Sequence, residues 1–246
     1  MTKIQLSFII VLISTVFSYG QAYEFGIQAG GGNYIGDIGR EYYFYPNKIG
    51  GGILFKRTVN PWFSLRLNLN YYQIRANDAE AESLGRQLRN FSVEGQIINF
   101  SAGIEYNFIP RNPYLPLKSL HRISPYMFLG LGLGSYSGRI YSNNIPHTNH
   151  PEDYGLEYSG ARLNIPMKLG IKYKVSRHFI LSLESGVSYF FTDDLDGTHA
   201  LYDNEAYLIK NKIVPSTNTN SNDWYSFSSI GFIYTFGDLN CYFNLF

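Results

Sequence analysis

The sequence lacks the features of a helical membrane protein, a lipoprotein or a nucleic-acid-binding protein. No apolar run is long enough to span a bilayer as a helix. No cysteine lies near the N-terminal apolar stretch, which argues against N-terminal lipidation. The 20 Lys and Arg residues nearly balance 19 Asp and Glu residues, so the charge gives no reason to expect nucleic acid as a partner. Without a linker, repeat array or low-complexity tract, the sequence predicts one domain.

The N-terminus predicts export. Lys3 gives a short basic start, residues 8–17 form an apolar stretch, and small residues follow as far as Ala22. We therefore expect residues 1–20 to be a signal peptide. Residues 21–246 are expected to form an outer-membrane β-barrel with a short periplasmic C-terminal tail.

The strongest positive signal is an alternation of apolar and polar residues with a period of two. In residues 63–72, for example, leucines at 65, 67 and 69 alternate with polar residues. Only a strand puts such neighbours on opposite faces. We expect strands at residues 23–31, 48–58, 63–74, 95–108, 124–137, 161–175, 179–191 and 224–236. In an exported chain, this pattern predicts an all-β fold, an eight-stranded antiparallel transmembrane β-barrel of outer-membrane type.

The connections between these strands alternate in length. Those around 59–62 and 176–178 are tight, and 109–122 is a moderate Pro-rich link. The long polar connections are 32–47, 75–94, 138–160 and 192–223. Outer-membrane barrels have short periplasmic turns and long outer loops. With an even number of strands, both termini are therefore expected in the periplasm.

Aromatic residues make up 17% of the chain, and in barrels Tyr and Phe accumulate at the membrane–water interfaces. We expect Trp224, Tyr225 and Phe227 to form part of such a girdle with Phe190 and Phe191. A tyrosine-rich soluble β-sandwich is the alternative fold.

The polar phase of the strands predicts a charged barrel interior. The inward charges are expected to be Arg66, Glu105, Lys168, Lys172 and Glu184. An eight-stranded barrel is just wide enough for side chains to fill it, so these acids and bases can pair across the lumen. A charge-lined solute channel is the less favoured alternative because too little space remains.

The sequence contains no convincing catalytic or metal site. Its five histidines stand at 121, 147, 150, 178 and 199, all in predicted loops or turns, and none has a serine or acid placed by strand spacing. His147 and His150 form a weak metal signal on a loop, and Asp193, Asp194 and Asp196 resemble only part of a calcium loop. We expect no enzymatic activity, cofactor or metal.

Cys241 is the only cysteine, and it follows the last predicted strand. A single cysteine in an oxidising compartment suggests an intermolecular disulfide or a free thiol. The alternative is an idle thiol packed among the aromatic residues of the tail. Cys241 is thus the candidate for a disulfide with a partner.

The order of several short motifs resembles the PorG-like outer-membrane barrels of the type IX secretion system of Bacteroidetes. The motifs are Gly31–Gly39, Asn60-Pro61, Ala76–Asp78, Glu105–Phe108, Phe191–Asp196, Asn222–Tyr225 and Tyr234–Gly237 followed by Cys241. The resemblance implies a noncatalytic integral component of the machinery for protein secretion and, in some species, gliding. It implies a periplasmic lipoprotein and its ring protein as partners, outer-membrane lipid as the environment, and a covalent tie through Cys241.

Two other functions remain open. The long outer loops could make the protein a surface-binding, adhesin-like barrel that recognises a ligand, a host surface or a glycan. A lipid-modifying outer-membrane enzyme is a third reading.

Overall fold

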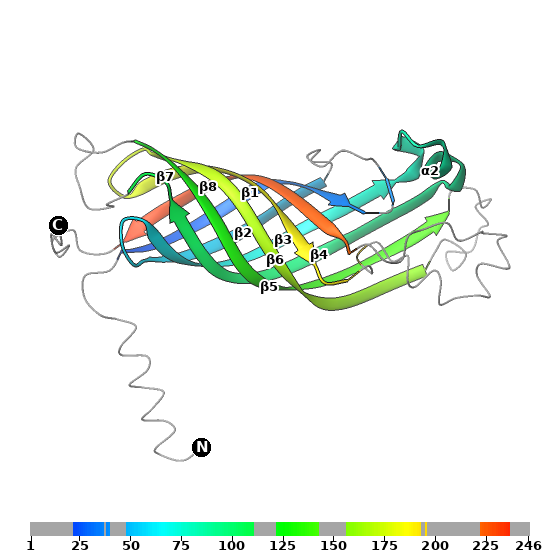
Figure 1. The fold of residues 1–246 in the computed structure, drawn as a ribbon, viewed down its shortest axis with the longest axis horizontal. Coiled ribbons are helices and arrows are strands. Elements are labelled where there is room, and N and C mark those ends of the chain that lie inside the picture. The colour runs from blue at the N-terminus through cyan, green and yellow to red at the C-terminus, as the bar shows by residue number, and fades with distance from the viewer. Residues whose placement is uncertain are drawn as a thin grey trace, which may run out of the picture.

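The computed structural model describes residues 22–36, 38–39, 48–110, 122–142, 156–192, 195 and 222–236. In this part of the chain, eight antiparallel strands follow one another around a closed barrel, and the last strand pairs with the first (Figure 1). The predicted fold class is therefore confirmed. The predicted signal peptide at 1–20 lies outside the described residues and stays a prediction.

The strands follow the predicted order. They are β1 (Tyr23–Ile35), β2 (Lys48–Thr58), β3 (Phe63–Asn77), β4 (Phe91–Asn107), β5 (Ile123–Ser142), β6 (Leu156–Lys174), β7 (Phe179–Phe190) and β8 (Trp224–Phe236). Between β3 and β4 lie a 3-10 helix, η1 (Asp78–Glu80), and a short α-helix, α2 (Leu84–Arg89). Among the described residues, no helix is long and apolar enough to cross a membrane.

The two ends of the barrel differ in how well their strand bounds were predicted. Bounds agree closely at the end with the tight turns, called here the short-turn end. At the opposite, long-loop end, five strands are longer than predicted. They are β1, which continues to Ile35, β3, to Asn77, β4, which starts at Phe91, β5, which continues to Ser142, and β6, which starts at Leu156. The predicted loops 32–47, 75–94 and 138–160 are shorter by these residues.

The middle of the barrel wall is apolar outside. On β3, the outward side chains from Phe63 to Tyr71 are all hydrophobic and 41–49% exposed. Nine residues are enough for a tilted strand to cross the hydrocarbon core. A closed barrel with such a band leaves no backbone edge in lipid, so the protein is suited to the outer membrane.

Aromatic side chains border the apolar band. At the short-turn end, the Tyr23 ring stacks on those of Phe55 and Phe236, with centroids 5.8 and 6.5 Å apart. At the long-loop end, Trp224 packs edge-on against Tyr189 at 4.8 Å. These positions match an interfacial girdle.

The predicted girdle is wrong for three residues. Tyr225, Phe227 and Phe190 face inward and are buried. The Tyr72 ring lies 4.7 Å from Tyr225 and 4.4 Å from Phe227. Neighbouring residues on a strand face opposite sides, so Trp224 can join the girdle only if Tyr225 turns into the barrel.

Beyond Tyr71, the two faces of the wall exchange polarity. The apolar residues now face inward and form one buried cluster: Tyr34, Ile38, Tyr72, Ile74, Ala76, Phe91, Val93, Ile97, Tyr136, Ile140, Tyr158, Phe190, Leu195, Tyr225 and Phe227. A wall in water needs an apolar inside, whereas a wall in lipid needs an apolar outside. The period of two continues across this boundary, but the apolar residues change sides, which explains the strand ends missed by prediction.

Short side chains close the tight turns. The Asn60 side-chain oxygen accepts hydrogen bonds from the amides of Trp62 and Phe63, at 2.9 and 2.8 Å. In the β6–β7 turn, the Ser176 hydroxyl accepts from the amide of Phe179 at 3.1 Å. Such side-chain acceptors satisfy turn amides that have no ladder partner.

Candidate functional site

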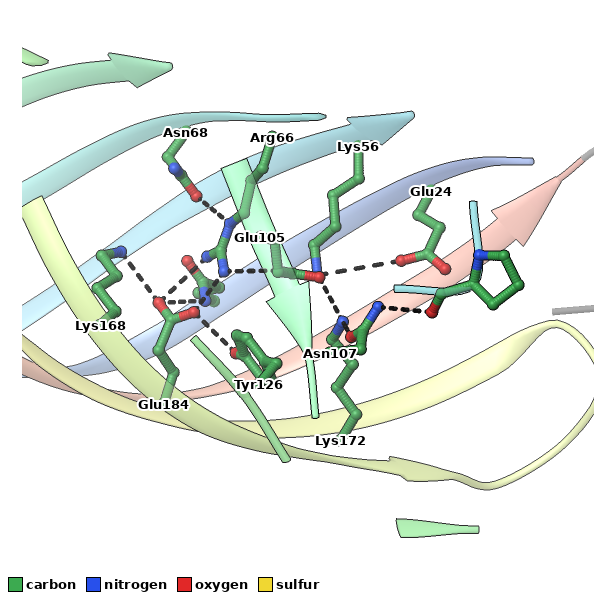
Figure 2. Close-up of polar contacts among 12 residues, drawn as sticks. Glu24, Lys56, Arg66, Asn68, Glu105, Asn107, Tyr126, Lys168, Lys172 and Glu184 are labelled. Atoms are coloured by element: carbon green, nitrogen blue, oxygen red, sulfur yellow. Dashed lines mark hydrogen bonds and ion pairs between the residues drawn. The ribbon is translucent and has the colours of Figure 1, made fainter. Parts of the chain in front are cut away.

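Arg66 lies at the centre of a buried ionic network in the lumen (Figure 2). Its Nη1 is 2.5 Å from Glu184 Oε2 and 3.1 Å from Glu105 Oε2, and its Nη2 donates to Glu184 Oε1 at 3.1 Å. Its Nε donates to the Asn68 amide oxygen at 2.6 Å. A guanidinium presents several donors in one plane, so one side chain from β3 can join carboxylates from β4 and β7.

Glu105 binds two further bases. Lys56 Nζ lies 2.8 Å from Glu105 Oε2 and 3.9 Å from Glu24 Oε2. Lys172 forms an ion pair with Glu105 and donates to the Asn107 amide oxygen at 2.7 Å. Four strands are thereby tied together inside the barrel.

Glu184 is the second acidic centre. Besides Arg66, it accepts hydrogen bonds from Lys168 Nζ at 2.9 Å, the Tyr126 hydroxyl at 2.8 Å and the Gln28 amide at 3.2 Å. A buried carboxylate is costly unless charges and donors surround it, and both acidic centres have such surroundings.

The structure brings all five sequence-predicted interior charges into this one network. Lys56 and Glu24 were not predicted, although Glu24 alternates with apolar Tyr23 and Phe25. Lys56 was harder to assign because the glycines at 50–52 blur the alternation in β2. The backbone pairing of Lys56 with Arg66 puts both side chains on the inner face.

Bases outnumber acids in the lumen, and aromatic rings compensate. Among the described residues, and apart from Asp78 and Asp223 at the long-loop end, the buried charged side chains are Glu24, Lys56, Arg66, Glu105, Lys168, Lys172, Lys174 and Glu184. Lys172 Nζ lies 4.4 Å from the centre of the Tyr126 ring, and the Arg66 guanidinium lies 5.0 Å from that of Phe128. The negative face of an aromatic ring attracts a cation.

Glycine makes space for these rings. A Cβ on Gly170 would lie 2.5 Å from the Tyr126 ring, so a larger residue there would displace it. The largest fully buried side chains include Arg66, Lys56, Lys172, Tyr126 and Phe128, so the lumen at this level is filled. The geometry supports a structural plug over a charge-lined conduit.

Replacing Lys56 with methionine is expected to lower the free energy of unfolding by about 1–3 kcal/mol, because Glu105 loses one buried cation but keeps Arg66 and Lys172. Urea titration followed by the gel-mobility difference between folded and unfolded barrel measures this. Arg57→Met, the adjacent outward-facing position, is the control and should change the midpoint much less. Equal midpoints for both variants would contradict the role of Lys56.

At the long-loop end, Asp223 joins three segments. Its Oδ1 accepts from the Tyr34 hydroxyl at 2.6 Å, and its Oδ2 accepts from the amide of Leu195 at 2.9 Å. Its backbone amide donates to the Thr192 carbonyl at 2.9 Å. The connection before β8 is thus attached to β1 and to the end of β7.

Asp78, between β3 and β4, has an equivalent role at the same end of the barrel. Fully buried, it accepts from the amides of Gly39 at 3.0 Å and Phe91 at 3.1 Å. Arg86 on α2 donates to the Gly39 carbonyl at 2.8 Å. Gly39 has φ +91°, a conformation that favours glycine. We call the segments joined by Asp78 and Asp223, with the apolar cluster beneath them, the rim.

Several sequence candidates lie outside the described residues. They are Cys241, His121, His147, His150, His199, Asp193, Asp194 and Asp196. His178, in the β6–β7 turn, is described, and its Nδ1 lies 3.0 Å from the carbonyl oxygen of Thr235 on β8. The described residues contain no group of three or more His, Cys, Asp or Glu side chains that could hold a metal.

The barrel is similar to several solved outer-membrane proteins at low sequence identity. A major outer membrane protein of Thermus thermophilus is 18% identical with a TM-score of 0.48, covering 87% of this chain and 99% of that one. Neisserial surface protein A is 14% identical with a TM-score of 0.45, over 87% and 99%. The attachment invasion locus protein Ail of Yersinia pestis is 13% identical with a TM-score of 0.43, over 89% and 99%.

A search of curated proteins found no match. A family model does match, and it extends over residues 3–244. This range includes all eight strands and nearly the whole sequence. The protein therefore belongs to the family described as a domain of unknown function, DUF6089.

Proposed function

We propose that this protein is a noncatalytic outer-membrane anchor and the PorG-like component of a type IX secretion machine. The filled lumen carries the proposal. Arg66 and its partners occupy the space that a channel would need. The surfaces that can bind a partner outside the lipid are therefore the two ends of the barrel. An anchor needs a stable, closed wall and one end that holds a partner.

The motifs behind the family resemblance support a shared architecture. Gly31–Gly39, Ala76–Asp78 and Asn222–Tyr225 are far apart in sequence but meet at the rim. The hydrogen bonds of Asp78 to Gly39 and of Asp223 to Tyr34 join them. A motif set that builds one tied rim is a stronger indication of common structure than isolated short matches.

The loop lengths support one orientation of the barrel in the membrane. Tyr23 pairs with Phe236, so both ends of the described barrel lie at the short-turn end. Outer-membrane barrels direct short turns to the periplasm. We place the termini, and the tail with Cys241, on that side, where a periplasmic lipoprotein and its ring partner would bind.

The test is recovery of partners from native outer membranes. Tagged protein is solubilised, run on a denaturing gel with and without reductant, and its companions are identified by mass spectrometry. We expect a reductant-sensitive band containing a periplasmic lipoprotein, absent from Cys241→Ser. Companions recovered equally with wild type and Cys241→Ser would reject the covalent tie but keep the anchor. A lone monomer in every lane would reject the anchor itself.

The noncatalytic part of the proposal has its own test. The mass distribution of lipid A and phospholipids should be the same in strains with and without the protein. A modified lipid that depends on the protein would support an enzyme instead.

A surface-binding barrel is the second candidate, favoured by the rim. An apolar core and two buried aspartates brace the long-loop end, as a platform for binding loops requires. Deleting 143–155 and 196–221 removes loop sequence while keeping β5, β6, Leu195 and Asp223. Lost ligand binding with normal secretion would favour this candidate, and lost secretion would favour the anchor.

A further inference from the structure

Four cross-strand rows on the outer face of β3–β6 run from apolar to charged. Nearest the middle of the barrel is the row Leu69, Phe100, Leu133 and Leu163. The next rows are Tyr71, Ile98, Ser135 and Ala161, then Gln73, Gln96, Ser137 and Ser159. The last row is Arg75, Glu94, Arg139 and Glu157. Each step is two residues, or about 7 Å along a strand, so the face changes from apolar to charged over about 20 Å along the tilted strands, from the hydrocarbon through the headgroup region.

A cavity of about 930 Å³ opens on this part of the wall. Tyr71, Gln73, Gln96, Ser137, Arg139 and Tyr141 are among the residues that line it. In Figure 1, β4, β5 and β6 extend further toward the long-loop end than β7 and β8. The cavity therefore lies on the taller side of the barrel, directly beyond the lipid-facing rows.

The polar groups around the cavity are held in place by one another. The Tyr71 hydroxyl donates to the Gln96 side-chain oxygen at 3.1 Å, and the Gln96 amide nitrogen lies 3.3 Å from the Ser137 hydroxyl. Arg139 forms an ion pair with Glu157, and Arg75 lies 3.7 Å from Glu94. Side chains ordered before binding lose less entropy when a ligand arrives.

The chemistry of this face fits a saccharide better than an anion. The charged side chains that line the cavity are Lys48, Arg139, Glu94 and Glu157, two of each sign, so no excess positive charge faces a phosphate. Amides, hydroxyls and a guanidinium supply donors and acceptors suited to adjacent sugar hydroxyls. Tyr71 and Tyr141 offer ring surfaces with polar tips, suited to the partly apolar faces of a sugar ring.

We propose that this face binds the saccharide headgroup of an outer-leaflet glycolipid. Its acyl chains lie against Leu69, Phe100 and Leu133, and its sugars occupy the cavity beside Gln73 and Gln96. The position selects a lipid source, because Tyr71 lines the cavity and stands in the row next to that of Leu69. The inference uses the orientation proposed above, with long loops outward, but does not depend on the anchoring role.

The experiment measures glycolipid retained by the purified full-length mature chain. Barrel in detergent is titrated with purified lipopolysaccharide, and bound molecules are counted by native mass spectrometry. Gln73→Leu with Gln96→Leu extends the apolar face by one row. The double variant is expected to bind about tenfold more weakly or worse. Tenfold corresponds to about 1.4 kcal/mol, which is the net contribution of one or two hydrogen bonds to the sugar. Ser185→Ala with Ser228→Ala, an outward hydrogen-bonded pair on β7 and β8, is the control and should retain the glycolipid.

Three results would overturn the proposal. If wild type and the Gln73, Gln96 double variant retain equal amounts of lipopolysaccharide, this face is excluded as the binding site. Phospholipid bound as tightly as lipopolysaccharide would exclude the saccharide, and delipidated oligosaccharide bound as tightly would exclude the lipid source. Gel mobility confirms that each variant is folded. Because no partner protein is present, these results are independent of partner recovery, and an epitope within 143–155 detected on intact cells tests the orientation separately.

Discussion

Arg66→Met is expected to lower the free energy of unfolding of the whole barrel by about 3–5 kcal/mol, the range for breaking a buried ionic network by removing one partner. Methionine fills much of the same space, so the loss is electrostatic. Glu184 would keep Lys168, Tyr126 and Gln28, but both its bonds to the guanidinium would be gone. Urea titration read by gel mobility or tryptophan fluorescence measures the change.

Arg75→Met is the matched control, because it changes the same residue type on the same strand. Arg75 faces outward, and its pair with Glu94 has side chains 48% and 51% exposed. An exposed pair contributes about 0–1 kcal/mol. Combining Arg66→Met with Glu184→Gln in a double-mutant cycle measures how much of the loss comes from the pair of Arg66 and Glu184. If Arg66→Met and Arg75→Met unfold at the same urea concentration, the lumen network does not stabilise the barrel.

Asp78→Ala is expected to loosen the rim while leaving the membrane part of the barrel folded. It would leave the buried amides of Gly39 and Phe91 without this acceptor, and each such amide costs about 1–3 kcal/mol. Hydrogen exchange at these two amides should become faster, and limited proteolysis should cleave the rim sooner. The urea midpoint should change less than in Arg66→Met, because the lumen network is intact.

Glu80→Ala tests whether the faster exchange depends on losing the buried carboxylate of Asp78 and not simply an acidic residue of this helix. Glu80 stands two residues away in the same 3-10 helix but is exposed. Its replacement should leave exchange at Gly39 and Phe91 unchanged. Protection of these amides that survives Asp78→Ala would show that other contacts alone hold the rim.

The fold and the lumen could be predicted because lipid imposes a simple rule. An outward side chain in hydrocarbon must be apolar, so Leu65, Leu67 and Leu69 reveal the phase of β3 and put Arg66 inside. The same rule applied to β4, β6 and β7 identifies Glu105, Lys168, Lys172 and Glu184. In β2, three successive glycines have no side chain, so they do not show which residues of the strand face outward. Lys56 was missed for that reason.

The rim could not be predicted in the same way. Asp78 and Asp223 are buried by contacts with segments distant in sequence, namely Gly39, Tyr34 and Leu195. No periodicity marks such a residue, because its position depends on where connections return across the barrel end. The family resemblance includes the motifs Ala76–Asp78 and Asn222–Tyr225, but a motif does not show which amide or hydroxyl donates a hydrogen bond to either carboxylate.

The sequence by itself determined that the chain forms eight antiparallel strands with tight turns at one end, since local alternation and turn residues are read from neighbours. It also determined which charges face inward wherever that alternation was clear. Only the tertiary structure decided which acid meets which base, where the wall exchanges its apolar and polar faces, and how Asp78 and Asp223 tie the rim. These depend on strand register and closure, and both are set by contacts between residues far apart in the chain.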